Sequence, residues 1–240
     1  MLNEQNKKAF LRNVSLALGR NAVPDQVEPF DFSKGPQNFM MNDLSQEELL
    51  EVFLKECDRL GTKYKMANAE NLKDVLLEVI ADYGGGKVLY PQTEEMERYG
   101  IYEAFEKAAQ ENDNTTYVMW DAEKGRQANI DLAQDANIGV TFPIAGIAET
   151  ATILQQCSRG SGRSIGLLPL THIAVVRKDT IYPRMTQTMA LLRQKFKEDR
   201  KAFPSNLVHI SGPSNTADIE LVRVVGVHGP INVTYIVLED

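Results

Sequence analysis

Cysteine is nearly missing from this sequence, whose 240 residues include only Cys57 and Cys157. Structural zinc sites and iron–sulfur clusters need several cysteines at short spacings, and neither residue belongs to a Cys-x-x-Cys pair. We therefore expect this chain to hold no metal ion and no cluster by itself. A disulfide between the two is not expected either, because the chain has the features of a cytosolic protein.

Long apolar segments are also missing. The longest apolar stretch, residues 165–176, is interrupted by Pro169, Thr171 and His172, and it is too short to cross a bilayer. The first residues lead into no continuous apolar segment of the kind that a secretory signal carries. The sequence therefore predicts a cytoplasmic protein without a membrane span.

Basic residues are fewer than acidic residues. The chain has 26 Lys and Arg residues against 33 Asp and Glu residues, a formal net charge of −7 at pH 7. Nucleic acids and anionic membranes require a concentrated basic surface, so neither is expected as the main partner. The densest basic stretch, residues 193–201, is interrupted by acids and is typical of a solvated helix face.

The sequence does contain the pattern of an α/β protein. Hydrophobic residues make up 43% of the chain and charged residues 25%, which suffices for one sizeable core. Helices are predicted from the Ser45 capping box to Gly61, over residues 72–83, near 94–110 and near 122–134. Apolar strands alternate with them at residues 62–67, 87–90, 117–120 and 138–142. This alternation predicts a mostly parallel sheet covered by helices on both faces.

The pattern changes after Pro143. Only one clear helix, near residues 184–200, lies between the predicted strands of this half. The strands are expected at residues 151–154, 173–176, 207–210 and 231–238. A mixed sheet or an antiparallel addition is therefore predicted for the second half.

The N-terminal segment differs from the rest. Apolar spacing predicts a helix over residues 3–18, and residues 19–42 lose all periodicity. The Phe and Met residues of this arm are expected to pack on a surface, either of this domain or of another subunit. We divide the chain into an N-terminal helix and arm, residues 1–42, and an α/β domain, residues 43–240.

A polar loop follows the predicted strand at residues 207–210 and continues to residue 230. Polar, tightly turning loops at strand ends are where α/β folds place their sites, so Asp218 and His228 are candidate catalytic residues. A helix start in this loop would bind an anion through its backbone amides and hydroxyls. The candidate ligand-binding residues there are Ser211, Gly212, Ser214, Thr216 and Glu220. A simple helix cap at Ser214 or Thr216 is the alternative.

Glu149 is a lone acid among small and apolar residues, between two predicted strands. A carboxylate in such surroundings is either paired or shifted in pKa, and either condition suits a nucleophile or a general base. Thr150 and Thr152 beside it are candidates for ligand binding. A glutamate that faces solvent at a strand end is the alternative.

Arg163 lies on a Gly- and Ser-rich loop, residues 159–164, where arginine can bind a carboxylate or a phosphate through two hydrogen bonds. An exposed hairpin tip is the alternative. His172 and His209 lie in apolar strands and are expected to be core histidines. His228, between glycine-containing turns, is the histidine for which we expect a function.

These segments resemble the LUD-domain family, and within it the lactate-utilization protein C type. The resemblance covers nearly the whole chain, and its strongest parts are residues 210–220 and 226–230. The other matching segments are residues 17–20, 139–141, 146–150 and 168–173. Two positions depart from the family pattern: Ala151 stands where the family usually has glycine, and Asn215 where it commonly has a basic residue. The second departure weakens the prediction of a strongly anionic ligand at this loop.

The resemblance implies a three-layer α/β/α sandwich like that of the sugar-isomerase and coenzyme A transferase superfamily, with a mixed, mostly parallel sheet. It also implies a role in bacterial lactate use, in which three proteins together oxidise L-lactate to pyruvate. Iron–sulfur clusters are expected on the partners, the proteins of the A and B types. This chain would be the cytoplasmic subunit without a cluster.

In that system the chain is expected to bind lactate, pyruvate or a partner. Arg163 or a nest of backbone amides would hold the small carboxylate. His228, oriented by Asp218 or Glu220, would take the hydroxyl proton.

Two other hypotheses stay open. The first is a stand-alone enzyme, resembling an acyl or coenzyme A transferase or binding a phosphate ligand, in which Glu149 attacks an acyl group and forms a mixed anhydride. The second is a non-catalytic scaffold whose arm, residues 30–41, docks partners.

Overall fold

The computed structural model describes residues 3–24, 26, 29, 31–216 and 224–239. The chain forms two compact units, residues 1–38 and residues 39–240. In the first unit, α1 (Glu4–Ala17) confirms the predicted N-terminal helix, and the Asn3 side chain caps it by accepting a hydrogen bond from the Gln5 amide. Two short 3-10 helices follow, η1 (Phe32–Lys34) and η2 (Pro36–Asn38). The domain boundary that the sequence predicts at residue 42 stays a prediction.

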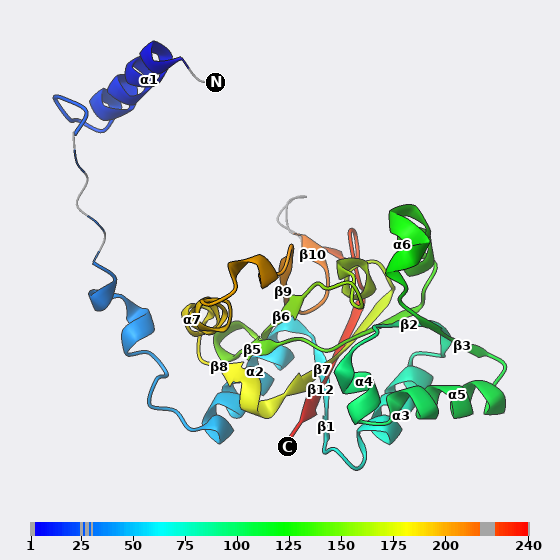
Figure 1. The fold of residues 1–240 in the computed structure, drawn as a ribbon. Coiled ribbons are helices and arrows are strands. Elements are labelled where there is room, and N and C mark those ends of the chain that lie inside the picture. Colours follow the sequence, from blue (N-terminus) through cyan, green and yellow to red (C-terminus); the bar gives the residue numbers. More distant parts are fainter. Residues whose placement is uncertain (1–2, 25, 27–28, 30, 217–223, 240) are drawn as a thin grey trace. The chain divides into compact units, whose positions relative to one another are not determined.

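The second unit is built on a six-stranded sheet in the order β1-β12-β7-β4-β2-β3 (Figure 1). Its strands are β1 (Lys63–Ala67), β2 (Gly86–Tyr90), β3 (Thr115–Met119), β4 (Ile138–Thr141), β7 (Thr171–Arg177) and β12 (Asn232–Leu238). Every neighbouring pair is parallel, which confirms the predicted parallel sheet.

Local signals bound the first helix of this unit. Ser45 and Glu48 form the predicted capping box, and Gly61 ends the helix in the left-handed conformation. The helical structure expected near residues 94–110 is confirmed, and Gly100, which is left-handed with φ of 62°, divides it into two helices. The helices are α2 (Gln46–Leu60), α3 (Leu72–Asp82), α4 (Glu94–Arg98), α5 (Ile101–Glu111), α6 (Gly125–Gln134) and α7 (Met185–Lys195).

A second, four-stranded sheet in the order β8-β5-β6-β9 confirms the antiparallel addition expected after Pro143. Its strands are β5 (Ala145–Ile147), β6 (Thr152–Gln156), β8 (Ile181–Tyr182) and β9 (Leu207–Ser211). The β5–β6 and β6–β9 pairs are antiparallel, and the β5–β8 pair is parallel. A short pair, β10 (Asn215–Thr216) with β11 (Val224–Val225), follows β9.

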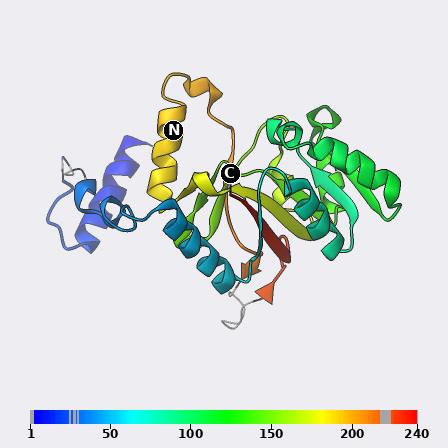
Figure 2. The same ribbon diagram turned by 90° about the horizontal axis from the view of Figure 1, so that it is seen from below.

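The core divides at the central sheet, because successive strand residues point to opposite faces. Ile173 and Val175 of β7 pack with α3, α4 and α5, whereas Ala174 and Val176 pack with α2 and the smaller sheet. Both views show α2 on one side of β7 and β12 and the helices α3 to α5 on the other (Figures 1 and 2). The protein therefore has the predicted α/β fold, with the smaller sheet contributing to one outer layer.

The last residues of the N-terminal arm, 39–42, belong to the second unit. Met41 packs against the cluster that α2 forms with the smaller sheet, whereas Phe39 is exposed on this unit. The packing of Phe39 on another subunit stays a prediction.

Gly139 in β4 is a position where the fold tolerates no side chain. A Cβ there would overlap the carbonyl oxygen of Ile165, in η5 (Arg163–Gly166), and would lie 3.0 Å from Pro169 Cγ. We expect Gly139→Ala to lower the free energy of unfolding by about 1–3 kcal/mol, because backbone must move to relieve the overlap. Urea unfolding measures this loss. Gly146→Ala is the control: a Cβ there would meet only side chains, 3.2 Å away or more, so equal losses would contradict the prediction.

Candidate functional site

Glu149 lies in the turn η4 (Ala148–Thr150) between β5 and β6, and its backbone amide donates a hydrogen bond to Pro183 O. Its carboxylate pairs with Arg184, with 2.8 Å between Oε1 and Nη2. The Arg184 side chain is 21% exposed and that of Glu149 34%, so the pair is shielded but reachable from solvent. Arg184 was not among the residues predicted from the sequence, because it stands at the N-cap of α7 without any motif around it.

The chain turns sharply after this glutamate. Ala151 is buried and left-handed, with φ of 42° and ψ of 39°. This conformation costs a non-glycine residue roughly 1–2 kcal/mol, which explains why glycine is usual at this position in the family that the sequence resembles. The turn separates the partly exposed Glu149 from the buried Thr152 at the start of β6.

Three hydroxyl groups are joined beside the turn. Thr150 Oγ1 lies 2.7 Å from Thr152 Oγ1, which lies 2.6 Å from Ser211 Oγ. The last contact follows from register, because Thr152 in β6 is paired with Ser211 in β9. The structure thus brings together three predicted ligand-binding residues from two separate segments. Each hydroxyl can donate or accept, so the chain of hydroxyls can reverse its hydrogen bonds.

Tyr235 of β12 fixes the backbone behind these hydroxyls. Its phenol oxygen accepts a hydrogen bond from the Gly212 amide at 3.3 Å and can donate to Ala151 O at 3.2 Å or Ile210 O at 3.4 Å. Burial raises the pKa of the Tyr235 phenol well above its usual value, so the group stays protonated and acts as a structural donor. This role was not predicted, because a tyrosine inside an apolar strand has no signal beyond that of a core residue.

The predicted C-terminal loop folds onto the residues that precede β12. The Ser214 amide donates to Pro230 O at 2.9 Å, and the Gly226 amide donates to Ser214 O at 2.8 Å. Thr216 pairs with Val224 in the β10–β11 strand pair, and residues 217–220, over which a helical turn was considered, lie outside the described residues. Gly212 is buried and left-handed, against Thr62.

The predicted acid–base residues are only partly placed. His228 is exposed, one residue before Gly229, which packs against Ser214. Asp218 and Glu220 lie outside the described residues. No hydrogen bond or ion pair joins His228 to Glu149 among the residues that the structure describes. A site that contains both residues therefore stays a prediction.

Arg163 lies apart from Glu149, at the start of η5, in a cavity that it lines with Trp120 and Arg126. His172 is a core histidine, as predicted: it is fully buried, with Nε2 2.7 Å from Thr141 Oγ1, and burial lowers its pKa to about 4. His209 is partly buried, and its pKa is also lowered by desolvation.

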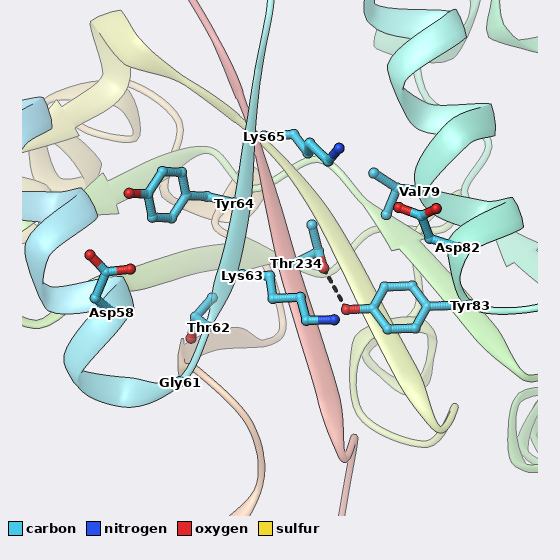
Figure 3. A pocket seen from close by; sticks show the side chains of 10 residues that line it. All are labelled: Asp58, Gly61, Thr62, Lys63, Tyr64, Lys65, Val79, Asp82, Tyr83 and Thr234. Atoms are coloured by element: carbon cyan, nitrogen blue, oxygen red, sulfur yellow. Dashed lines mark hydrogen bonds between the residues drawn. The ribbon is translucent and has the colours of Figure 1, made fainter.

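A cavity of about 450 Å³ lies along the edge strand β1 (Figure 3). Lys63 and Lys65 project from the strand; Lys63 Nζ lies 5.2 Å from the ring centre of Tyr83, whose hydroxyl is 2.8 Å from Thr234 Oγ1. Lysines on an edge strand hinder its pairing with another chain. We therefore assign Lys63 and Lys65 in this cavity to the protection of the sheet edge.

Burial affects the thiols of both cysteines. Cys57 is buried in the core, and burial raises the pKa of its thiol to about 12; the pKa of Cys157 is also raised by burial. Within the described part of the chain, no three His, Cys, Asp or Glu side chains gather where they could hold a metal ion. No described helix is long and apolar enough to cross a membrane.

The fold and site define an α/β protein in which a small mixed sheet presents a Glu–Arg pair and a chain of hydroxyls beside a parallel sheet. The LUD domain matches residues 50–238, and the chain belongs to the LUD-domain family. This confirms the resemblance found in the sequence.

Relatives cover almost the whole chain. Proteins named lactate utilization protein C are 40% identical in Bacillus licheniformis (98% of this chain, 97% of that protein) and 40% identical in Anoxybacillus flavithermus (97% and 99%). The protein of that name from Bacillus subtilis is 36% identical (98% and 97%). A crystal structure of a DUF162 family protein from Deinococcus radiodurans has the same fold, with a TM-score of 0.56 and 22% identity over 81% of this chain and 99% of that one.

Proposed function

We propose that this chain takes part in lactate utilization, as a cytoplasmic subunit of a multi-protein iron–sulfur system that oxidises L-lactate to pyruvate. The observation that carries the proposal is the 40% identity to proteins named lactate utilization protein C, over 98% of the chain. In this proposal the clusters reside on partner proteins of the A and B types. The cysteine content supports that assignment, because the chain has only Cys57 and Cys157, whereas an iron–sulfur cluster usually takes four cysteine ligands.

Within the proposal, the small carboxylate lies at the Glu149–Arg184 pair. Arg184 Nη2 pairs with Glu149, and Nη1 lies 3.1 Å from Met40 Sδ, a weak acceptor that a second carboxylate would replace. The hydroxyls of Thr150 and Thr152 are close enough to Glu149 in the chain to contact the same ligand. Arg184 thus takes the role that was predicted for Arg163. Glu149 is then the base nearest to the lactate hydroxyl, and His228 is the alternative base.

The test is a tagged pull-down from lactate-grown cells, with assays of the eluate for iron, sulfide and lactate-dependent dye reduction. Iron-containing partners together with activity that the isolated chain lacks would support the proposal. A protein that emerges without partners or iron, from cells that grow on lactate, would overturn it.

Replacing Arg184 by glutamine is expected to lower the lactate-dependent activity of the complex roughly tenfold or more, because a charged hydrogen-bond donor is lost. The matched control is Arg177→Gln. Arg177, the last residue of β7, also pairs with an acid, Asp179, and its replacement should leave the activity unchanged. Equal effects of the two variants would contradict a role for Arg184 in ligand binding. Full activity after His228→Ala would exclude His228 as the base.

One observation favours a second candidate, acyl transfer by Glu149. About a third of the Glu149 side chain is exposed at a sharp turn, where an acyl group can reach it. Incubation with an acyl thioester followed by mass spectrometry tests this function. An adduct on Glu149 supports it, and the absence of both an adduct and thioester exchange excludes it.

A further inference from the structure

A cavity of about 480 Å³ lies between α6 and the loop that leads to η5, and neither candidate function uses it. It contains the only tryptophan of the chain. Its lining combines flat apolar side chains with cations and one buried amide. Among the lining residues are Trp120, Arg126, Asn129, Ile130, Arg163 and Leu167.

The Trp120 indole is held in place as one wall of this cavity. Its Nε1 donates a hydrogen bond to Arg159 O at 3.1 Å. Gly162 packs so closely against the indole that a Cβ at this position would overlap the ring. An indole fixed in this way, with Ile130 and Leu167 in the same lining, offers a rigid platform for a planar ring.

Three arginines line the same cavity, Arg126, Arg159 and Arg163. The guanidinium of Arg159 is paired with Glu123, whereas those of Arg126 and Arg163 form no hydrogen bond or ion pair with another of the described residues. Such a pair of uncompensated cations stands out in a chain whose net charge is −7. Guanidinium groups bind phosphate through paired, charge-assisted hydrogen bonds, so an anionic group on the ligand would satisfy both.

A buried amide completes the lining. Asn129 is only 3% exposed, and its Nδ2 donates to Asp121 O at 2.7 Å and to Gly125 O at 3.0 Å. Its Oδ1 is buried and has no hydrogen-bond partner in the described part of the chain. A buried acceptor without a partner costs free energy, so a donor from a ligand would stabilise it.

We propose that this cavity binds a nucleotide. The base stacks on Trp120, the phosphate pairs with Arg126 and Arg163, and an N–H group of the base donates to Asn129 Oδ1 after a small side-chain adjustment. The volume is within the range of small-molecule sites, and a three-carbon acid such as lactate would leave most of it empty. The proposal goes beyond the lactate role and does not depend on it.

The single tryptophan makes the test direct, because fluorescence excited at the indole reports on this cavity alone. The isolated chain is titrated with AMP, and separately with adenosine and with inorganic phosphate. We expect saturable quenching by AMP at much lower concentration than by either part. Absence of saturable quenching by AMP, or equal affinity for phosphate alone, would overturn the proposal.

Substitution of the arginines tests where the phosphate of AMP binds. Arg126→Gln and Arg163→Gln are each expected to weaken AMP binding roughly tenfold or more. Arg177→Gln is the matched control, since Arg177 is not among the lining residues and its guanidinium is already paired with Asp179; the affinity of this variant for AMP should stay within about twofold of the parent. Equal affinities of all three variants would refute the assignment. Because no lactate and no partner protein is present, failure here is distinct from failure of the lactate role.

Discussion

Replacing Phe53 by alanine is expected to lower the free energy of unfolding by about 3–5 kcal/mol. Phe53 of α2 is fully buried, and its ring stacks on that of Tyr235, with 5.6 Å between the ring centres and 28° between the planes. The variant loses both the burial of the ring and this contact, and it leaves a cavity in the middle of the cluster between α2 and the central sheet.

The effect should reach the candidate site. The Tyr235 hydroxyl binds the backbone of Ala151 and of Gly212, so a displaced ring loosens both segments that carry the hydroxyl chain. Urea unfolding gives the free energy, and amide exchange at Gly212 reports the local loosening. Phe53→Leu keeps most of the volume and is expected to cost about 1.5 kcal/mol or less. A similar loss of unfolding free energy for both variants would show that the volume of the side chain at position 53 does not determine the stability of this cluster.

The elements that the sequence predicted correctly are those with local signals. The Ser45 capping box and the left-handed Gly61 bound α2 because both act within a few residues. The order of the strands had no such signal. β12, the last strand, lies between β1 and β7, and this pairing joins residues that are far apart in the chain. Only the packing of the complete core selects it.

The same distinction between local signals and long-range contacts explains which residues of the candidate site could be predicted. Glu149 was found because an acid among small and apolar residues is unusual, and Thr150, Thr152 and Ser211 because of their motifs. Arg184 was missed because it contacts Glu149 only when β8 lies beside β5. Trp120 had no motif either, and its relation to Arg163 depends on the loop that passes over the end of β3.

The stability of the protein is expected to fall between pH 6.5 and about pH 4, because of His172. In the folded state this ring is fully buried beside Thr141, and burial lowers its pKa from 6.5 to about 4. Below pH 6.5 the unfolded chain therefore binds a proton that the folded chain does not. The stabilisation from a neutral His172 is complete above pH 6.5 and is lost as the pH falls to about 4, by roughly 3 kcal/mol in total.

The measurement is the free energy of unfolding as a function of pH for the parent and for His172→Gln. Carboxylates titrate in the same range in both proteins, so the difference between the two curves isolates the histidine. The glutamine variant should lose the His172 contribution to the slope of the free energy of unfolding against pH. It keeps a side chain that can hydrogen-bond to Thr141. His209→Gln is the comparison: His209 is only partly buried, so its removal should change the slope less. Parallel curves for the parent and His172→Gln would show that His172 has the same pKa in the folded and unfolded states, so that the folded protein protonates the imidazole below pH 6.5. That protonation would require an acceptor for Nδ1 that the described residues do not provide.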